Sequence, residues 1–311
     1  MPWVIGIDEA GYGPSLGPLV QAAVAWPLPE GDLAGWTTLQ RVVRRRHEKR
    51  DHRLLIDDSK KVYAHGGLAA LEEGVWALWG QSAATLSALI GPEASPENPE
   101  GFAEPWFDPG ERLPTVIDGA GAWAATAPFR DAIGQRWASA IRLVTTAAFN
   151  RIVTEAGTKA AVLSRGWITL LDAVMRQLPH DDEPVHVISD KHGGRNYYAA
   201  LVQQAFPDRG VATEMESAAE SRYRVDSRTR VITITFRPRA DGDSVTVALA
   251  SMLCKYLREV CMRQFNRYWL ERVPGLRPTA GYPVDAQRFF AEIQPALEKL
   301  GLTRDHIWRQ K

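Results

Sequence analysis

Acidic side chains at three separate places share one local setting, the end of an apolar run or the start of a predicted helix. Asp8 and Glu9 close the apolar, β-branched run that begins at Val4, and Asp190 closes a second such run. Asp241 lies where a long helix is predicted to begin. Carboxylate oxygens suit Mg²⁺ or Mn²⁺, whereas zinc prefers histidine or cysteine. Two such ions about 4 Å apart can position a water molecule and polarise a phosphodiester. The four acids therefore indicate metal-dependent hydrolysis.

The first two acids run directly into a glycine-rich turn. A strand points consecutive side chains to opposite faces, so Asp8 and Glu9 converge only where the strand ends or bulges. Gly11 and Gly13 provide that freedom and leave backbone N–H groups open to a phosphate or a sugar. Two close carboxylates raise each other's pKa unless a cation lies between them. The alternative is a hydrated turn with two solvent-exposed acids, which the turn alone does not exclude.

Several other polar residues compete with this set. Asp118 also follows a short apolar run, but the glycines after it favour a turn. We therefore rank Asp118 below the four acids as a candidate site residue. Asp241 has a second explanation, because aspartate caps helix N-termini. None of the seven histidines pairs with another at helical ligand spacing. His192 is the one to test, since it lies two residues beyond Asp190.

The composition is that of an ordinary globular protein. The 311 residues are 45% hydrophobic, and 37 basic residues balance 37 acidic ones, so overall charge indicates no nucleic-acid partner. Residues 41–53 hold seven Lys/Arg against two acids, which predicts a local phosphate-binding patch or a solvated helix face. The chain has no P-loop motif, basic leader or long apolar span. We therefore expect a cytoplasmic protein without membrane association.

Alternation of apolar strands and helices predicts an α/β fold with a central mixed sheet. Residues 91–114, with six prolines and six acids, predict an irregular acidic excursion. We expect the acids to gather in a cleft at one edge of this sheet. A C-terminal helical region is expected to carry Tyr282 to the same cleft. The pattern predicts strands at 4–8, 19–26, 184–190, 210–216 and 228–236, and helices following residue 61 and at 127–157, 159–178, 196–206, 245–269 and 285–300.

Four motifs resemble those of type 2 ribonuclease H, the ribonuclease HII family. Asp8-Glu9-Ala10-Gly11-Tyr12-Gly13-Pro14, followed by Gly17-Pro18, resembles the family's Asp-Glu-Ala-Gly-Arg-Gly-Pro opening. Asp58-Ser59-Lys60 is similar to its Asp-Ser-Lys. Ala240-Asp241, followed by Ser251, Lys255 and Arg258, resembles its Ala-Asp segment and following helix. Gly281-Tyr282-Pro283 resembles the Gly-Tyr-Pro of the archaeal and eukaryotic branch. The motifs occur in the family's order and span nearly the whole chain.

The resemblance implies a ribonuclease H-like fold with a five-stranded mixed sheet flanked by helices. A catalytic domain would span 1–272, with an irregular insertion at about 91–125, and a helical extension at 273–311 would complete the cleft. The implied activity is cleavage of RNA in RNA–DNA hybrids, or at ribonucleotides in duplex DNA, by two Mg²⁺ or Mn²⁺ ions, leaving 3′-hydroxyl and 5′-phosphate ends. We expect a monomer.

The resemblance also implies a role for each matching residue. The implied metal-binding and catalytic carboxylates are Asp8, Glu9, Asp190 and Asp241, with Asp243 as competitor if the register from Ser251 slips. Gly11 and Gly13 would contact the ribonucleotide through their backbone. Lys60 would hold a phosphate, and Tyr282 would stack near the sugar and sense its 2′-hydroxyl. Tyr12 belongs to the same substrate-binding set.

Three departures define a divergent member. Tyr12 replaces the motif's arginine, residues 191–195 follow Asp190 where the family usually has a glycine, and about fifty residues separate Asp190 from Asp241. Extra strands are therefore expected between these two acids. Two alternatives stay open, a nuclease for another nucleic-acid structure and a module that binds duplexes without cutting them.

Overall fold

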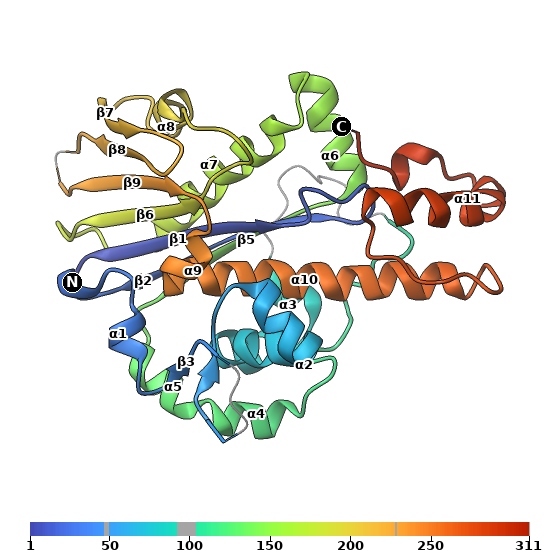
Figure 1. The fold of residues 1–311 in the computed structure, drawn as a ribbon, viewed down its shortest axis with the longest axis horizontal. Helices are drawn as coiled ribbons and strands as arrows, with labels where there is room; N and C mark the ends of the chain where they lie inside the picture. The colour runs from blue at the N-terminus through green and yellow to red at the C-terminus, as the bar shows by residue number, and fades with distance from the viewer. Residues whose placement is uncertain (47–49, 92–103, 228, 311) are drawn as a thin grey trace.

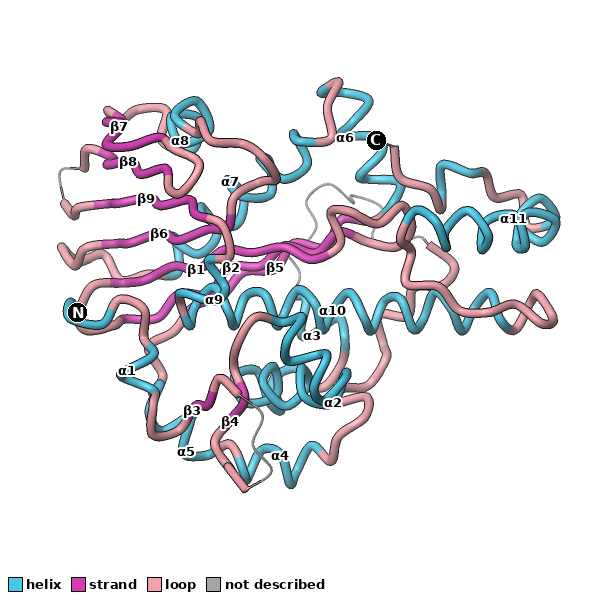
Figure 2. Tube along the Cα trace, viewed as in Figure 1, coloured by secondary structure: helices cyan, strands magenta, loops and turns pink. Residues whose placement is uncertain are grey.

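A seven-stranded mixed sheet forms the centre of the protein (Figures 1 and 2). The structure is a computed structural model that describes residues 1–46, 50–91, 104–227 and 229–310. The strand order is β5-β2-β1-β6-β9-β8-β7. β1, β6 and β9 are parallel, whereas the other neighbours are antiparallel. The strands are β1 (Trp3–Ala10), β2 (Leu19–Pro27), β5 (Ala138–Val144), β6 (Val185–Asp190), β7 (Val211–Glu216), β8 (Ser221–Val225) and β9 (Ile232–Arg237).

The predicted mixed sheet is confirmed, but the strand number of five is wrong. β7 and β8 extend the sheet beyond β9, and in the chain they lie between β6 and β9. The sequence predicted extra strands between Asp190 and Asp241, and β7 corresponds to the one predicted at 210–216. A separate pair, β3 (Val43–Arg44) and β4 (Leu54–Leu55), is parallel. Since β3 lies within the basic run, the described part of that run is not the face of a helix; residues 47–49 lie outside the described residues.

Helices cover both faces of the sheet (Figure 1). α7 packs on one face and α10 on the other, and two separate apolar cores result. Alternate residues of β1 divide between them, with Val4 in the α10 core and Ile5 in the α7 core. The α-helices are α1 (Trp36–Leu39), α2 (Ser59–Trp79), α3 (Leu86–Ile90), α4 (Gly119–Ala125), α5 (Ala127–Ile133), α6 (Thr146–Ala156), α7 (Ala160–Gln177), α8 (Ala199–Ala205), α9 (Ala240–Asp243), α10 (Val245–Leu270) and α11 (Pro283–Lys299).

The predicted helix over 127–157 is wrong in its middle. Gly134, at φ 68°, ends α5, and the chain then forms edge strand β5 before α6. The alanine content of this stretch favours a helix, but pairing of β5 with β2 overrides that propensity. The strand predicted at 228–236 begins at Ile232, and β8 was not predicted. The helix predicted from residue 245 is confirmed as α10.

The C-terminal region packs on the distal half of α10 (Figure 1). Phe289 and Ile293 of α11 share a core with Phe265 and Trp269. The segment before α11 also meets the glycine-rich turn, because Ser15 N–H donates to the Gly281 carbonyl at 2.8 Å. The division into domains at residue 272 stays a prediction.

The predicted 91–114 excursion lies partly outside the described residues, which resume at Glu104. Trp106 is buried and its ring lies 5.3 Å from that of Phe265. Glu72 accepts hydrogen bonds from the N–H groups of residues 115–117. The described part of the excursion is therefore irregular but packed. None of the helices in the described ranges is long and apolar enough to cross a membrane.

Close approach of α10 to β1 requires a glycine in the strand. A Cβ atom on Gly6 would lie 2.2 Å from the Val247 nitrogen and 2.3 Å from the Thr246 carbonyl carbon. Both are backbone atoms, which cannot move without shifting the helix.

Replacing Gly6 with alanine should lower the free energy of unfolding by about 3 kcal/mol, because the methyl group overpacks a rigid contact. Urea denaturation measures the change. Gly31→Ala is the matched control, since a Cβ there meets nothing within 4 Å. Equal stability of the two variants would show that the contact between α10 and β1 is not rigid.

Candidate active site

The carboxyl ends of the three parallel strands bring the predicted acids to one edge of the sheet. Ile7 pairs with Ser189, so Asp8 and Asp190 are the next residues on neighbouring strands. Asp190 in turn pairs with Arg237 at the end of β9, and α9 with Asp241 follows directly. Parallel strands thus account for the meeting of residues more than 180 positions apart.

Asp8 points toward α10 and is buried. Burial is the main cause that raises its pKa well above the ordinary value, and the charge of Glu9 adds to it. A hydrogen bond with the Ser251 side chain opposes the rise, while the charges of Asp241 and Asp190 strengthen it. Burial and the charge of Asp190 raise the pKa of Glu9 to about 8, against the attraction of Lys60.

The other two acids have similar surroundings. Burial raises the pKa of Asp190, although the N–H groups of Lys191 and Arg239 donate to its Oδ1 at 3.0 and 2.8 Å. Burial, then the charges of Asp58 and Asp190, raise the pKa of Asp241 to about 6. All four predicted acids therefore lie close enough to act on one another, in surroundings that disfavour their negative charge. This cluster of four side chains is called the carboxylate pocket below.

This pocket suits divalent cations by charge and by donor type. Four mutually repelling carboxylates are hard oxygen donors with an excess of negative charge. Within the described ranges, however, no group of three or more His, Cys, Asp or Glu side chains is arranged to hold a metal ion. Mg²⁺ commonly takes only one or two carboxylates and completes its shell with water and substrate phosphates. By charge and donor type, the four carboxylates therefore fit divalent cations.

Asp58 is a fifth acid that the sequence analysis did not assign. Its side chain accepts from the Lys60 N–H at 2.8 Å and caps α2, and its charge acts on Asp241. Ser59 accepts a hydrogen bond from Ser251 at 2.9 Å. The Asp58-Ser59-Lys60 motif therefore lies at the pocket as a unit. The Asp58-Ser59-Lys60 motif in the sequence could have identified Asp58, but a role was predicted only for Lys60.

The structure distinguishes the competing acids by their partners. Asp243 forms an ion pair with Arg237 at 3.6 Å and is 56% exposed. Asp241 instead interacts with Asp58 and Asp190. Asp118 caps α4, accepting from two backbone N–H groups of that helix, so its predicted turn is the start of a helix.

The two glycines of the turn have different surroundings. Gly11 has φ 95°, and a Cβ there would lie 2.6 Å from the Pro18 carbonyl oxygen and 2.9 Å from Arg258 Cδ. A Cβ on Gly13 would meet nothing within 4 Å. Packing therefore explains Gly11, whereas Gly13 is open to an approaching ligand.

The two predicted tyrosines also differ in exposure. Tyr12 is half-buried and its ring lies 4.3 Å from Lys159 Nζ, while burial and the charge of Glu9 raise its pKa. Tyr282 is 56% exposed, directly after Gly281, whose carbonyl accepts from the turn. Tyr282 therefore follows a residue that is bonded to the glycine-rich turn, and its role at the cleft stays a prediction.

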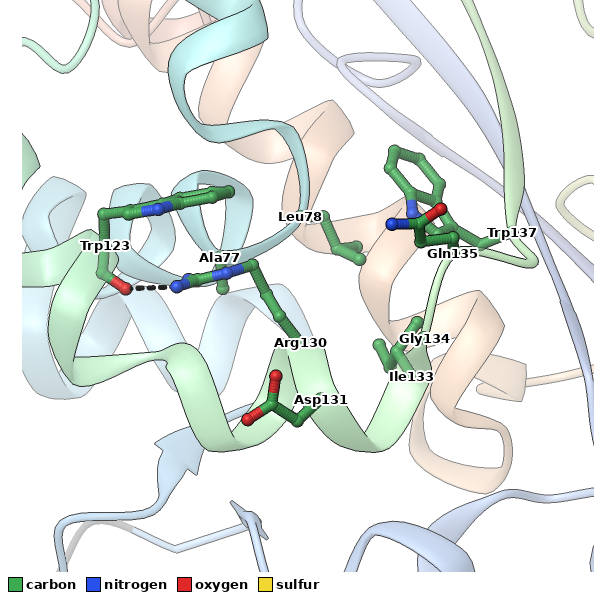
Figure 3. A pocket seen from close by; sticks show the side chains of 9 residues that line it. All are labelled: Ala77, Leu78, Trp123, Arg130, Asp131, Ile133, Gly134, Gln135 and Trp137. Atoms are coloured by element: carbon green, nitrogen blue, oxygen red, sulfur yellow. Dashed lines mark hydrogen bonds between the residues drawn. The ribbon is translucent and has the colours of Figure 1, made fainter.

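A cavity of about 560 Å³ lies elsewhere, between α2, α4 and α5 (Figure 3). Its walls include Trp123 and Trp137, and the Arg130 guanidinium stacks 3.5 Å from the Trp123 ring. None of the predicted site residues lines it. The carboxylate pocket therefore remains the candidate site on chemical grounds.

A basic residue outside the predicted set borders the acids. Arg45, from the basic run, donates to the Gly242 carbonyl and to Asp57. Its guanidinium also lies 4.3 Å from the Trp36 ring. These contacts place Arg45 beside α9, and the phosphate-binding patch stays a prediction.

No protein-family model and no curated protein matches this chain. Among solved structures, ribonuclease H2 from Pyrococcus horikoshii is 13% identical with a TM-score of 0.47, over 98% of this chain and 92% of that one. Ribonuclease HII from Archaeoglobus fulgidus, solved in complex with PCNA, is 14% identical with a TM-score of 0.42, over 99% and 94%. Bst ribonuclease HIII in complex with Mn²⁺ is 17% identical with a TM-score of 0.41, over 99% and 66%.

Without divalent metal, stability should fall as pH rises from about 4.5 to about 8. The folded state holds the Glu9 proton more tightly than the unfolded state does, so this stabilisation is present at low pH and is lost through that window. Glu9→Gln should therefore flatten the dependence, measured by urea denaturation at several pH values in EDTA. Asp172→Asn, an exposed change on α7, is the control. Parallel curves for all three proteins would contradict the electrostatic assignment.

The solved structures to which the chain is similar are type 2 ribonucleases H, at 13, 14 and 17% identity.

Proposed function

We propose that this protein is a metal-dependent endonuclease that cleaves the RNA strand of RNA–DNA hybrids or cuts at ribonucleotides embedded in duplex DNA. The observation that carries the proposal is the meeting of Asp8, Glu9, Asp190 and Asp241 in one pocket where each carboxylate has a raised pKa. The Asp-Glu-Ala-Gly opening motif supports the substrate class by its resemblance to ribonuclease HII.

The proposed cofactors are Mg²⁺ or Mn²⁺ ions, held by the four carboxylates. When bound, they would activate water and stabilise the charge on the leaving oxygen. Ser251 and the N–H groups that donate to Asp190 orient two of the acids. Lys60, whose charge acts on Glu9, Asp190 and Asp241, would hold a phosphate of the substrate.

Residues of the turn and of the C-terminal region would bind the substrate. Gly13 leaves its backbone open to the ribonucleotide. Tyr282 would stack near the sugar, because its ring is exposed beside the turn. Tyr12 would line the same side from its half-buried position.

The alternatives differ in what the acids are for. A module that only binds duplexes gains nothing from burying four mutually repelling carboxylates, so the raised pKa values argue against it. A nuclease for another nucleic-acid structure is favoured by Tyr12, which replaces a cation in the opening motif. A panel of hybrids, junctions and single strands distinguishes that nuclease from the proposed one.

A duplex with one ribonucleotide should be cut in Mg²⁺ or Mn²⁺, leaving a 3′-hydroxyl end. Asp241→Asn should slow this cleavage about a thousandfold, because loss of a metal ligand removes several kcal/mol of charge stabilisation. Asp243→Asn is the matched control and should retain activity within a few-fold. Gel analysis of single-turnover reactions measures both. If the variants lose activity equally, Asp241 has no special role, and absence of cleavage by the native protein in either metal would refute the function.

Tyr282→Phe should keep the stacking surface but lose the hydroxyl contact with the ribose. We expect the ratio of cleavage at a ribonucleotide to cleavage at a deoxyribonucleotide to fall about fivefold, the value of one hydrogen bond. Tyr268→Phe on α10, whose ring packs against Trp106 and Trp269, serves as control. Equal changes on both strands would exclude a role in sensing the 2′-hydroxyl.

A further inference from the structure

Residues 191–197, here called the 191–197 loop, follow Asp190 directly and have no role in the proposed function so far. The loop joins β6 to α8. It lies beside the carboxylate pocket, because the charges of Asp190 and Glu9 both act on Tyr198 at its end. Under the proposed function, a segment in this position would contact the nucleic-acid substrate.

The first cation of the loop is used internally. Lys191 is buried, and its Nζ donates to Asn196 Oδ1 at 2.9 Å and to the Ser217 carbonyl. Ser221 Oγ donates to the Asn196 carbonyl at 2.6 Å. Lys191 therefore fastens the loop to the segment around β8 instead of facing a phosphate.

An aromatic cluster fixes the rest of the loop. The His192 N–H donates to the Tyr198 hydroxyl at 2.8 Å, and the Tyr198 N–H donates to the Tyr223 hydroxyl at 2.8 Å. The Tyr198 ring stacks on Phe236 at 3.8 Å. β8 and β9 thus hold the loop in one shape, which lowers the entropic cost of binding a ligand.

The outer side of the loop presents open backbone. Gly193 and Gly194 are exposed, and a Cβ on either would meet nothing within 4 Å. Gly193 has φ 60°, which explains its residue type. Gly194 does not have a positive φ, so nothing inside the protein requires it to lack a side chain. Close approach of an external group to the backbone would require it.

An exposed aromatic ring follows this open backbone in the chain, three residues after Gly194. Tyr197 is 72% exposed, an unusual position for a large ring. Arg195 Nε donates to the Tyr197 carbonyl at 2.7 Å, and Arg195 Nη1 lies 3.3 Å from Ser164 Oγ. The backbone of Tyr197 is therefore held while its ring faces solvent.

We infer that the 191–197 loop binds an unpaired nucleotide beside the cleavage site, with its base stacked on Tyr197 and its phosphate against Gly193 and Gly194. A base within a duplex is already stacked on its neighbours, so an exposed aromatic ring stacks on bases that are unpaired. The inference rests on the proposed function and narrows it to duplexes in which a ribonucleotide borders an unpaired nucleotide. Arg195 contributes positive charge near that phosphate.

Binding of two duplexes without divalent metal tests the inference independently of catalysis. Both carry one ribonucleotide, and one has an unpaired 2-aminopurine next to it. The native protein should bind this duplex about tenfold more tightly than the fully paired one and quench the 2-aminopurine fluorescence. Tyr197→Ala should abolish the preference and the quenching. Val231→Ala, an exposed change in the turn before β9, should leave both unchanged.

Gly194→Ala provides a second variant. We expect it to fold normally, because the added Cβ meets nothing within 4 Å. It should weaken binding of the unpaired duplex while thermal stability stays native. Equal quenching by native protein and Tyr197→Ala, or absence of any preference in the native protein, would overturn the inference even if ribonucleotide duplexes are cut. Quenching that depends on Tyr197 without cleavage in Mg²⁺ or Mn²⁺ would instead refute the proposed function and leave the nucleotide-binding role of the loop intact.

Discussion

Repulsion among Asp8, Glu9, Asp190 and Asp241 is the constraint that the surrounding structure must withstand. Burial strengthens it, because few water molecules screen the charges. A cooperative core on each face of the sheet supplies the opposing stability, and Gly6 lets α10 lie directly against β1 where the acids begin. Such a pocket is costly in the absence of cations. It becomes favourable when positive charge enters, which couples cation binding to stability of the fold.

The glycine-rich turn depends on residues far along the chain. Buried Arg258 of α10 donates to the carbonyls of Leu16, Pro18 and Ala280, and so joins the turn to the segment before α11. Near the C-terminus, the Arg309 N–H donates to the Ser15 carbonyl at 2.9 Å. The backbone of the turn is therefore fixed from two sides, while Gly13 stays open. Positioning of a ligand against the turn would then follow from α10 and the C-terminal region together.

Sequence patterns predicted the elements whose periodicity and ends agree with their environment. β1 ends at the acids and glycines that mark it, and α10 keeps helical spacing over its whole length. β5 was not predicted, because its alanines favour a helix. Only its pairing with β2 makes it a strand. Gly11 and Gly13 look alike in sequence, and the φ of Gly11 and its contacts with Arg258 and Pro18 distinguish them. The contact of Lys191 with the Ser217 carbonyl could not be predicted from the sequence either, since Ser217 is 26 residues away.

The cations near the acids are arranged asymmetrically. Lys60 and Arg45 reach the acids from α2 and from the segment after β3, on the α10 side of the sheet. On the other side, Lys191 is tied to Ser217, and Tyr12 stands where the resembling motif has an arginine. Under the proposed function, a substrate strand would be held mainly by cations on the first side, and stacking and open backbone would discriminate on the second. The acids would then keep their proposed chemistry while residues on the second side determine the shape of the accepted nucleic acid.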